Sequence, residues 1–317
     1  MPVHPLIAAK FPLLDGITSF EALITDPALR DRFAEFSRTP AGGPPPEVPW
    51  QSVSVDGPHG PVPARIYRQD HGDDQPCLVW LHGGAFRMGD LEMPEADWVA
   101  RELVTRTGAV VVSVDYRLAT GGVCYPVPHD DVVAVLRWVR DQADDLGVTS
   151  ICAGGASAGG NLAAGAALKV RDEDDWQPRG LALVYPVLHP RLPPAPASLT
   201  ARMAEVPALL HFPPDEVRRI TENYLGGPVS RADGYAMPGL AELEGLCRTL
   251  VLTAEYDDLR GSGQVFAGQL AESGVDVRHV QVESMLHGFL NLSSALEPVG
   301  RALDLIASVV LPDGGEK

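Results

Sequence analysis

Short β-rich runs alternate with longer helical segments from about residue 51 onward, and this alternation restricts the fold more than any other feature of the chain. It is typical of βαβ units, which build a mostly parallel sheet between two layers of helices. The central runs are apolar at nearly every position, as expected of strands that are buried on both faces. Eight strands are predicted, and they begin at Gln51, Ala64, Cys77, Ala109, Ser150, Leu181, Thr249 and Val277.

Two regions interrupt this alternation. Residues 1–48 contain amphipathic helical pieces and end in a proline-rich stretch, and residues 189–228 begin with a proline-rich stretch that leads into helical patterns. We expect both regions to pack on top of the sheet as a cap, which leaves 49–188 and 229–317 as the domain that carries the sheet. In that domain, Asp130 is expected to cap the helix that follows it.

Charge and composition narrow the class of protein. Asp and Glu number 42 against 25 Lys and Arg, a formal charge of −17, and such a surface repels nucleic acid and anionic lipid. No apolar run approaches the ~18–20 residues of a membrane-spanning helix, and the N-terminal residues lack the pattern of a secretory signal, so a cytoplasmic location is predicted. The four cysteines are widely spaced and are expected to be free thiols, and no cluster of ligands predicts a metal.

Ser157 is the candidate nucleophile. The sequence GASAG at 155–159 lies between a β-rich run and a helix of small residues, which is the strand–turn–helix context of a nucleophile elbow. Glycines flank the serine because only residues without bulk let the neighbouring backbone approach so sharp a turn. A glycine-rich turn that serves packing alone is the competing interpretation.

A second motif, HGGA at 82–85, follows another buried run. Acyl transfer creates an oxyanion that needs preorganised N–H donors, and one such donor is worth about 3–4 kcal/mol. A Gly-Gly turn exposes its backbone N–H groups without side-chain cover. We predict that Gly83, Gly84 and Ala158 are these donors, with a plain tight turn as the alternative.

A serine hydroxyl needs a base, and the base needs a carboxylate that orients it. A carboxylate among Glu255, Asp257 and Asp258 follows the predicted strand at 249–255, and His287 follows the next strand. The order serine, acid, histidine is that of α/β-hydrolases.

Several segments together resemble the hormone-sensitive-lipase family of esterases, also called the GDXG group or bacterial lipolytic family IV. The resemblance implies an α/β-hydrolase fold with an eight-stranded, mostly parallel sheet and a helical cap, and hydrolysis of short-to-medium acyl esters without a cofactor. It also selects Asp257 as the triad acid, because Asp257 aligns with the acid of the family's DPLRD pattern; Asp258 is then expected to cap the next helix. The segments are HGGAF at 82–86, VDYRLA at 114–119, YPVPHDD at 125–131, GASAGGNLA at 155–163, AEYDDLR at 254–260 and HGF at 287–289.

The chain departs from the family pattern at four places. Ala85 stands where a third glycine is common, and Ala156 replaces the usual Asp or Thr before the nucleophile. Asp258 occupies a position where proline is usual, and TGGVC at 120–124 replaces the usual Pro-Glu segment.

The predicted function is a carboxylesterase with a Ser157–His287–Asp257 triad and an acyl-enzyme intermediate. The expected partner is a small-molecule ester, with neither nucleic acid nor membrane, and a homodimer is compatible with the sequence. One alternative is an amidase or N-deacetylase with the same machinery; another is a ligand-binding protein on a hydrolase scaffold, which the presence of His287 disfavours. Candidate pocket residues are Phe86, Tyr185, Leu209, Phe212 and Phe289, with Phe11, Phe20, Phe33 and Phe36 as weaker candidates because aromatic residues at helical spacing are more often ordinary packing.

Overall fold

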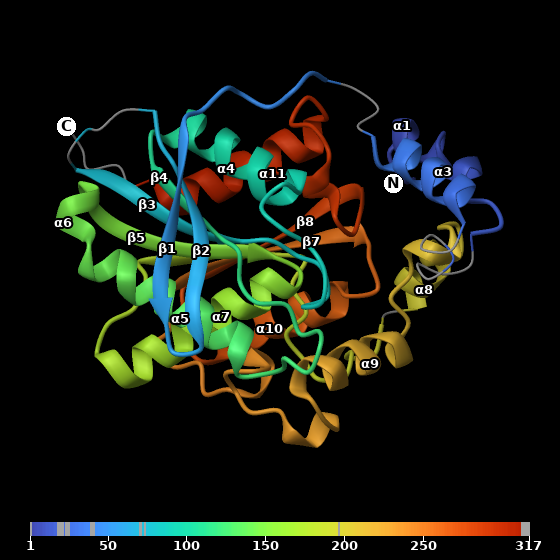
Figure 1. The fold of residues 1–317 in the computed structure, drawn as a ribbon. Helices are drawn as coiled ribbons and strands as arrows, with labels where there is room; N and C mark the ends of the chain where they lie inside the picture. The colour runs from blue at the N-terminus through green and yellow to red at the C-terminus, as the bar shows by residue number, and fades with distance from the viewer. Residues whose placement is uncertain are drawn as a thin grey trace.

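The computed structural model describes residues 2–17, 22, 26–38, 42–69, 72, 74–195 and 197–311. Its centre is one eight-stranded sheet in the order β1-β2-β4-β3-β5-β6-β7-β8 (Figure 1). Strand β2 pairs antiparallel with β1 and β4, and every other pairing is parallel. The predicted α/β-hydrolase architecture, a mostly parallel sheet flanked by helices, is therefore confirmed.

All eight strands overlap the runs predicted from the sequence. The sixth ends three residues early, because Tyr185 adopts a positive φ of 37° and Pro186 has no N–H to give to a ladder. The strands are β1 (Trp50–Gly57), β2 (Gly60–Tyr67), β3 (Gln75–Leu81), β4 (Val110–Val114), β5 (Val148–Ala156), β6 (Gly180–Val184), β7 (Arg248–Tyr256) and β8 (Val277–Leu286).

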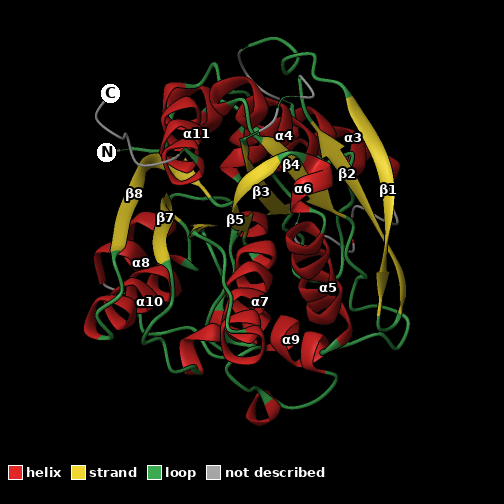
Figure 2. Cartoon of the chain, turned by 90° about the vertical axis from the view of Figure 1, so that its left-hand side faces the viewer, coloured by secondary structure: helices red, strands yellow, loops and turns green. Residues whose placement is uncertain are grey.

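Helices cover both faces of the sheet (Figures 1 and 2). One face packs against α4 (Pro94–Thr107) and α11 (Glu297–Val310), and the other against α5 (Val127–Asp141), α7 (Ala158–Asp174) and α10 (Arg260–Glu272). Alternate residues of β3 belong to the two layers: Leu78 and Trp80 pack with α4 and α11, and Val79 and Leu81 with α5 and α7. Each such buried aliphatic side chain contributes about 1.5–3 kcal/mol to folding.

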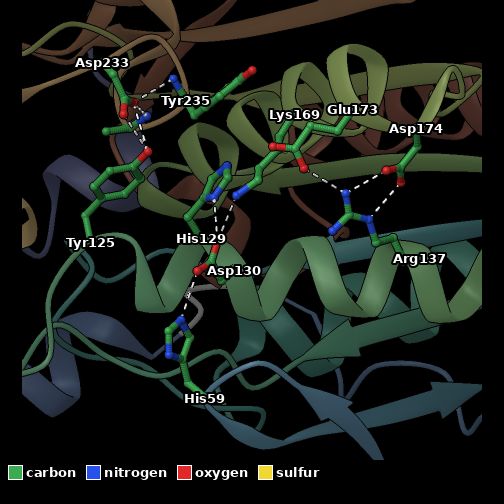
Figure 3. Close-up of polar contacts among 11 residues, drawn as sticks. His59, Tyr125, His129, Asp130, Arg137, Lys169, Glu173, Asp174, Asp233 and Tyr235 are labelled. Carbon is green, nitrogen blue, oxygen red and sulfur yellow. Dashed lines mark hydrogen bonds and ion pairs between the residues drawn. The ribbon is translucent and has the colours of Figure 1, made fainter.

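Asp130 does not cap a helix, so that prediction was wrong. Helix α5 begins earlier, at Val127, where prolines flank its first turn, and no side chain caps it. The carboxylate of Asp130 instead contacts His59 Nε2 at 2.9 Å and Lys169 Nζ at 3.2 Å (Figure 3). Asp130 and Lys169 line a groove of about 620 Å³ over α5 and α7, which no predicted site residue lines.

Two groups of helices lie together beside the sheet (Figure 1). The N-terminal helices are α1 (Pro5–Ala8), η1 (Phe11–Leu14) and α3 (Pro27–Ser37), and the inserted helices, between β6 and β7, are α8 (Ala197–Met203), η2 (Ala208–Leu210) and α9 (Pro214–Leu225). Leu209 packs with Leu14 and Ile17 in a small apolar cluster that joins the two groups.

The remaining elements are short. They are α6 (Ala143–Leu146), η3 (Val229–Arg231), η4 (Pro238–Leu240) and η5 (Phe289–Asn291). Among the described residues, no helix is long and apolar enough to cross a membrane. Phe20, a weaker candidate for the pocket, lies outside the described residues.

Candidate active site

Five neighbouring strands, β3, β5, β6, β7 and β8, run parallel and end at the same edge of the sheet. The carboxyl edge of such a sheet is where α/β proteins bind their ligands. In each case the first residue after the strand belongs to the candidate site: His82 after β3, Ser157 after β5, Tyr185 after β6, Asp257 after β7 and His287 after β8. The sheet backbone thus brings together residues that lie up to 205 positions apart, from 82 to 287.

Ser157 lies on a sharp turn between β5 and α7, with φ 55° and ψ −116°. A non-glycine residue in this region is strained by about 1–3 kcal/mol, and the bond from its N–H to Val184 O at 2.8 Å helps to hold it there. The flanking glycines are required by space. A Cβ on Gly159 would lie 2.2 Å from Leu81 O, and one on Gly155 would lie 2.5 Å from the carbonyl carbon of Gly159.

Ser157, His287 and Asp257 form one hydrogen-bonded chain. His287 Nε2 lies 3.0 Å from Ser157 Oγ, and His287 Nδ1 lies 2.8 Å from Asp257 Oδ2. The other carboxylate oxygen of Asp257 accepts the N–H of Leu259 at 2.8 Å, which fixes the acid. In the tautomer that this arrangement favours, Nδ1–H donates to Asp257 and Nε2 accepts the hydroxyl proton of Ser157.

The charge around His287 favours its protonated form. Burial alone lowers its pKa, but the negative charge of Asp257, the hydrogen bond to it, and the charges of Glu95 and Asp258 outweigh burial. The pKa of His287 is therefore raised above its ordinary value. The same groups stabilise an imidazolium at this position.

Asp258 points away from His287, although it is the neighbour of Asp257. Its carboxylate accepts the N–H of Phe212 at 2.7 Å and lies 3.6 Å from Nδ1 of His211. Helix α10 begins at Arg260 without a side-chain cap, so the expected capping role of Asp258 was wrong. Asp258 thus joins the segment of the inserted helices at Phe212 to the loop that contains Asp257.

The HGGA loop supplies a different set of N–H groups from the one predicted. The N–H of Gly83 donates to Glu95 Oε2 at 2.6 Å, which removes Gly83 from the set of free donors. Within the described part of the chain, the N–H groups of Gly84, Ala85 and Ala158 make no hydrogen bond. These groups are available to a bound oxygen.

Three of the five predicted pocket residues lie around His287. The rings of Tyr185 and Phe212 are 4.7 and 4.8 Å from its ring, and Phe289 packs edge-on against Tyr185 at 5.0 Å. The other two are engaged elsewhere. Phe86 stacks on Tyr224 at 4.0 Å, and Leu209 packs with the N-terminal helices, so neither is placed against the base.

Glu95 is not among the residues predicted for the site, yet it is only 2% exposed and contacts three loops of the site. Glu95 follows Pro94 in the first turn of α4. Acidic residues are common in the first turn of helices, so the sequence around Glu95 does not indicate a role in the site. No group of three or more His, Cys, Asp or Glu side chains in the described ranges is arranged to hold a metal ion.

The family model of the α/β hydrolase fold matches residues 78–291. The chain belongs to this family, within its hormone-sensitive-lipase-like group. Carboxylesterase NlhH of Mycobacterium tuberculosis is 32% identical over 95% of this chain and 93% of its own length. The hyperthermophilic esterase of the archaeon Pyrobaculum calidifontis has a similar structure, with a TM-score of 0.80 and 31% identity over 98% of both chains. Arylacetamide deacetylase of Bos taurus is 29% identical over 78% of this chain and 76% of its own length.

Proposed function

We propose that this protein is a carboxylesterase that hydrolyses short-to-medium acyl esters through an acyl-enzyme intermediate on Ser157. The observation that carries the proposal is the hydrogen-bonded chain from Asp257 through His287 to Ser157, at a strained turn beside free N–H groups. The esterase relatives support the same reaction class.

In the first half of the reaction, Ser157 Oγ attacks the ester carbonyl carbon while His287 Nε2 takes the hydroxyl proton. The carbonyl oxygen becomes an oxyanion that accepts hydrogen bonds from the N–H groups of Gly84, Ala85 and Ala158. The tetrahedral intermediate then collapses, His287 gives its proton to the leaving alcohol, and an acyl ester of Ser157 remains. Asp257 stays ionised throughout and holds the imidazole in the productive tautomer.

In the second half, water attacks the acyl carbonyl and His287 takes a proton from that water. The same N–H groups hold the second oxyanion. Collapse breaks the bond to Ser157 Oγ, which recovers its proton from His287, and the carboxylic acid leaves. Every step uses groups of this chain and water, so the proposal needs no cofactor.

The inserted and N-terminal helices are proposed to act as a cap that limits the acyl chain, with residues 1–48 and 189–228 as its two parts. Two contacts support this role. The ring of Phe212 packs against His287, and the apolar cluster around Leu209 joins the two groups of helices. A pocket closed in this way favours acyl chains up to about hexanoate or octanoate.

A panel of p-nitrophenyl esters from acetate to laurate, run beside the matching p-nitroanilides, tests the proposal. We expect turnover of the short esters to exceed turnover of laurate and of every anilide. Faster hydrolysis of laurate than of butyrate would contradict the bounded pocket, and the absence of hydrolysis of every ester would contradict the esterase activity.

An amidase or N-deacetylase is the second candidate, favoured by the similarity to the bovine deacetylase. Amide cleavage uses the same groups but requires the leaving nitrogen to be protonated in place. Hydrolysis of the acetyl anilide faster than the acetyl ester would select this candidate. A cytoplasmic location and a homodimer stay predictions from the sequence.

A further inference from the structure

Glu95 is a carboxylate buried beneath the candidate active site, with 2% of the residue exposed. A buried charge is costly unless hydrogen bonds or an opposite charge compensate it. No Lys or Arg of the described residues forms an ion pair with Glu95. Its compensation therefore comes from hydrogen bonds, and all of the partners belong to the site.

The two carboxylate oxygens accept from different loops. Oε2 accepts the N–H of Gly83 at 2.6 Å, and Oε1 accepts the O–H of Tyr185 at 2.5 Å and an N–H of Asn291 Nδ2 at 3.4 Å. Tyr185 Oη in turn accepts the N–H of Leu290 at 3.4 Å, so its own proton is directed to Glu95. All of these groups donate, which is the arrangement that an ionised carboxylate requires.

These partners hold the two loops that the proposed reaction uses. They are the oxyanion loop, residues 82–93 between β3 and α4, and the histidine loop, residues 287–296 between β8 and α11. Gly83 directly precedes Gly84 and Ala85, two of the proposed oxyanion donors. On the other side, Asn291 Nδ2 also donates to Gly288 O at 3.2 Å, in the residue after His287. The backbone N–H of Glu95 donates to Asn291 Oδ1 at 3.2 Å, so the side chain and the backbone of Glu95 both contact the histidine loop.

Space around the first glycine supports the same role. A Cβ on Gly83 would lie 2.6 Å from Glu95 Oε2 and 3.2 Å from Ser157 Cβ. The carboxylate therefore fills the only direction in which Gly83 could carry a side chain, and it sets the position of this residue against the nucleophile.

We propose that Glu95 is a positioning residue that fixes the oxyanion loop and the histidine loop relative to each other. The inference rests on the proposed function, because it assigns Glu95 a part in the same reaction. Glu95 does not touch the reacting atoms. It acts through Gly83 on the N–H groups of Gly84 and Ala85, and through Tyr185 and Asn291 on His287.

Glu95 also contributes charge. Ser157, Tyr185 and Asp257 contact His287, and the carboxylates of Glu95 and Asp258 act on it through their charge. Burial, with Glu95 close by, raises the pKa of Tyr185 well above its usual range, so that phenol stays neutral. Removal of the charge of Glu95 therefore lowers the pKa of His287 and moves the acid limb of the activity profile to lower pH.

Two variants separate position from charge. Glu95→Ala removes the carboxylate, and Glu95→Gln keeps its shape and an acceptor for Gly83 but removes the charge. The matched control is Glu92→Gln, three residues earlier, whose side chain is 74% exposed and pairs with Arg65. Each variant is assayed with p-nitrophenyl butyrate for kcat and KM across pH, and with an alkylboronic acid, which adds to Ser157 Oγ and places a tetrahedral oxygen among the N–H donors.

We expect Glu95→Ala to lower kcat by about 10²–10³, the loss produced by removing one oxyanion donor. KM should change only a few-fold, and affinity for the boronic acid should fall by about the same factor as kcat. Glu95→Gln should lose less and shift the acid limb to lower pH, and Glu92→Gln should match the unaltered protein.

Unchanged kcat and boronate affinity in a folded Glu95→Ala variant would overturn the proposal. If that variant does not fold, Glu95→Gln decides: an unaltered acid limb with unaltered kcat contradicts the proposal, and a shifted limb supports it. A failure of the proposed function would look different, because unaltered protein would then not hydrolyse the ester or bind the boronic acid at Ser157.

Discussion

The carboxyl edge of the sheet and the inserted helices beside it are held by different kinds of interaction. At the edge, Ser157, Asp257 and His287 each follow directly on a strand, and β7 is buried at every position except its first. The inserted helices bury apolar side chains in the two core clusters, such as Leu199 of α8 and Tyr224 of α9, and their polar contacts with this edge are few. The bond from the Phe212 N–H to Asp258 is the one beside the base.

Two ion pairs also join the inserted helices to this edge. Arg202 of α8 pairs with Glu255 at the end of β7, and Glu216 of α9 lies 3.5 Å from Arg87 of the oxyanion loop. The pair of Arg87 and Glu216 is partly exposed, and pairs of this type contribute about 0–1 kcal/mol, whereas the carboxylate of Glu255 is buried. We infer that strands buried on both faces fix the groups of the triad, whereas the contacts of the inserted helices set access to them. Variants at the edge should therefore lower kcat, and variants among the helices should change KM.

Asp257→Asn should have the largest effect of the predictions that test this comparison. An amide at this position stabilises the wrong tautomer of His287 and removes the charge that supports the imidazolium. We expect kcat to fall by about 10⁴, the loss that this substitution causes in a serine protease, with little change in melting temperature. Steady-state kinetics and thermal melting measure both, and a kcat within tenfold of the unaltered protein would assign the acid elsewhere.

The pH profile should show the next largest effect. Only neutral His287 accepts the serine proton, so activity is lost as pH falls through its pKa, about tenfold per unit below it. Because Asp257 and the other nearby carboxylates raise that pKa, the inflection should lie above the ordinary histidine value of about 6.5. The measurement is kcat/KM from pH 5 to 9, and a rate independent of pH between 5 and 8 would argue against a histidine base.

Asp258→Ala should have a smaller effect, on binding. The variant frees the N–H of Phe212, a loss of about 0.5–1.5 kcal/mol for one hydrogen bond, and loosens the ring that packs on His287. We expect KM to rise a few-fold while kcat stays within about threefold. Asp258→Asn keeps an acceptor for this N–H and is the matched control. Its KM should lie between that of the unaltered protein and that of Asp258→Ala. If Asp258→Ala instead lowers kcat by orders of magnitude, the two aspartates exchange roles.

Asp130→Asn should have the smallest effect. Its contacts with His59 and Lys169 join α5 to its neighbours, and Asp130 and Lys169 line a groove that no residue of the triad lines. The loss should be about 1 kcal/mol of stability or less, with kcat and KM unaltered. A change in either kinetic constant would show that this groove is coupled to the reaction.

The sequence predicts the edge of the sheet far better than the contacts around it. Apolar runs locate the strands because burial on both faces requires apolar residues at nearly every position. The GASAG turn locates Ser157 because a sharp turn requires small residues. The contact of Asp258 could not be predicted from the sequence, because its partner Phe212 is 46 residues away and offers only a backbone N–H. The predicted capping role of Asp130 was wrong because Pro126 and Pro128 place the start of α5 at Val127, three residues before Asp130.

The error at Gly83 has the same physical origin. A Gly-Gly turn exposes N–H groups to whatever lies nearby, and the partner of Gly83 is a buried carboxylate that comes from another element, the first turn of α4. Among the pocket candidates, Phe212 reaches His287 and Phe86 does not, because side-chain direction depends on the path of each loop.

The most direct test of the central claim is the reaction of Ser157 itself. Unaltered protein and Ser157→Ala are assayed with p-nitrophenyl butyrate, and each is treated with a p-nitrophenyl phosphonate, which forms a stable adduct on an activated serine and releases p-nitrophenol. We predict that the unaltered protein is inactivated by one adduct, located on the peptide that contains Ser157. Folded Ser157→Ala should neither turn over the ester nor take up the label. Retained turnover by folded Ser157→Ala, or an adduct on another residue, would contradict the assignment of Ser157 as the nucleophile.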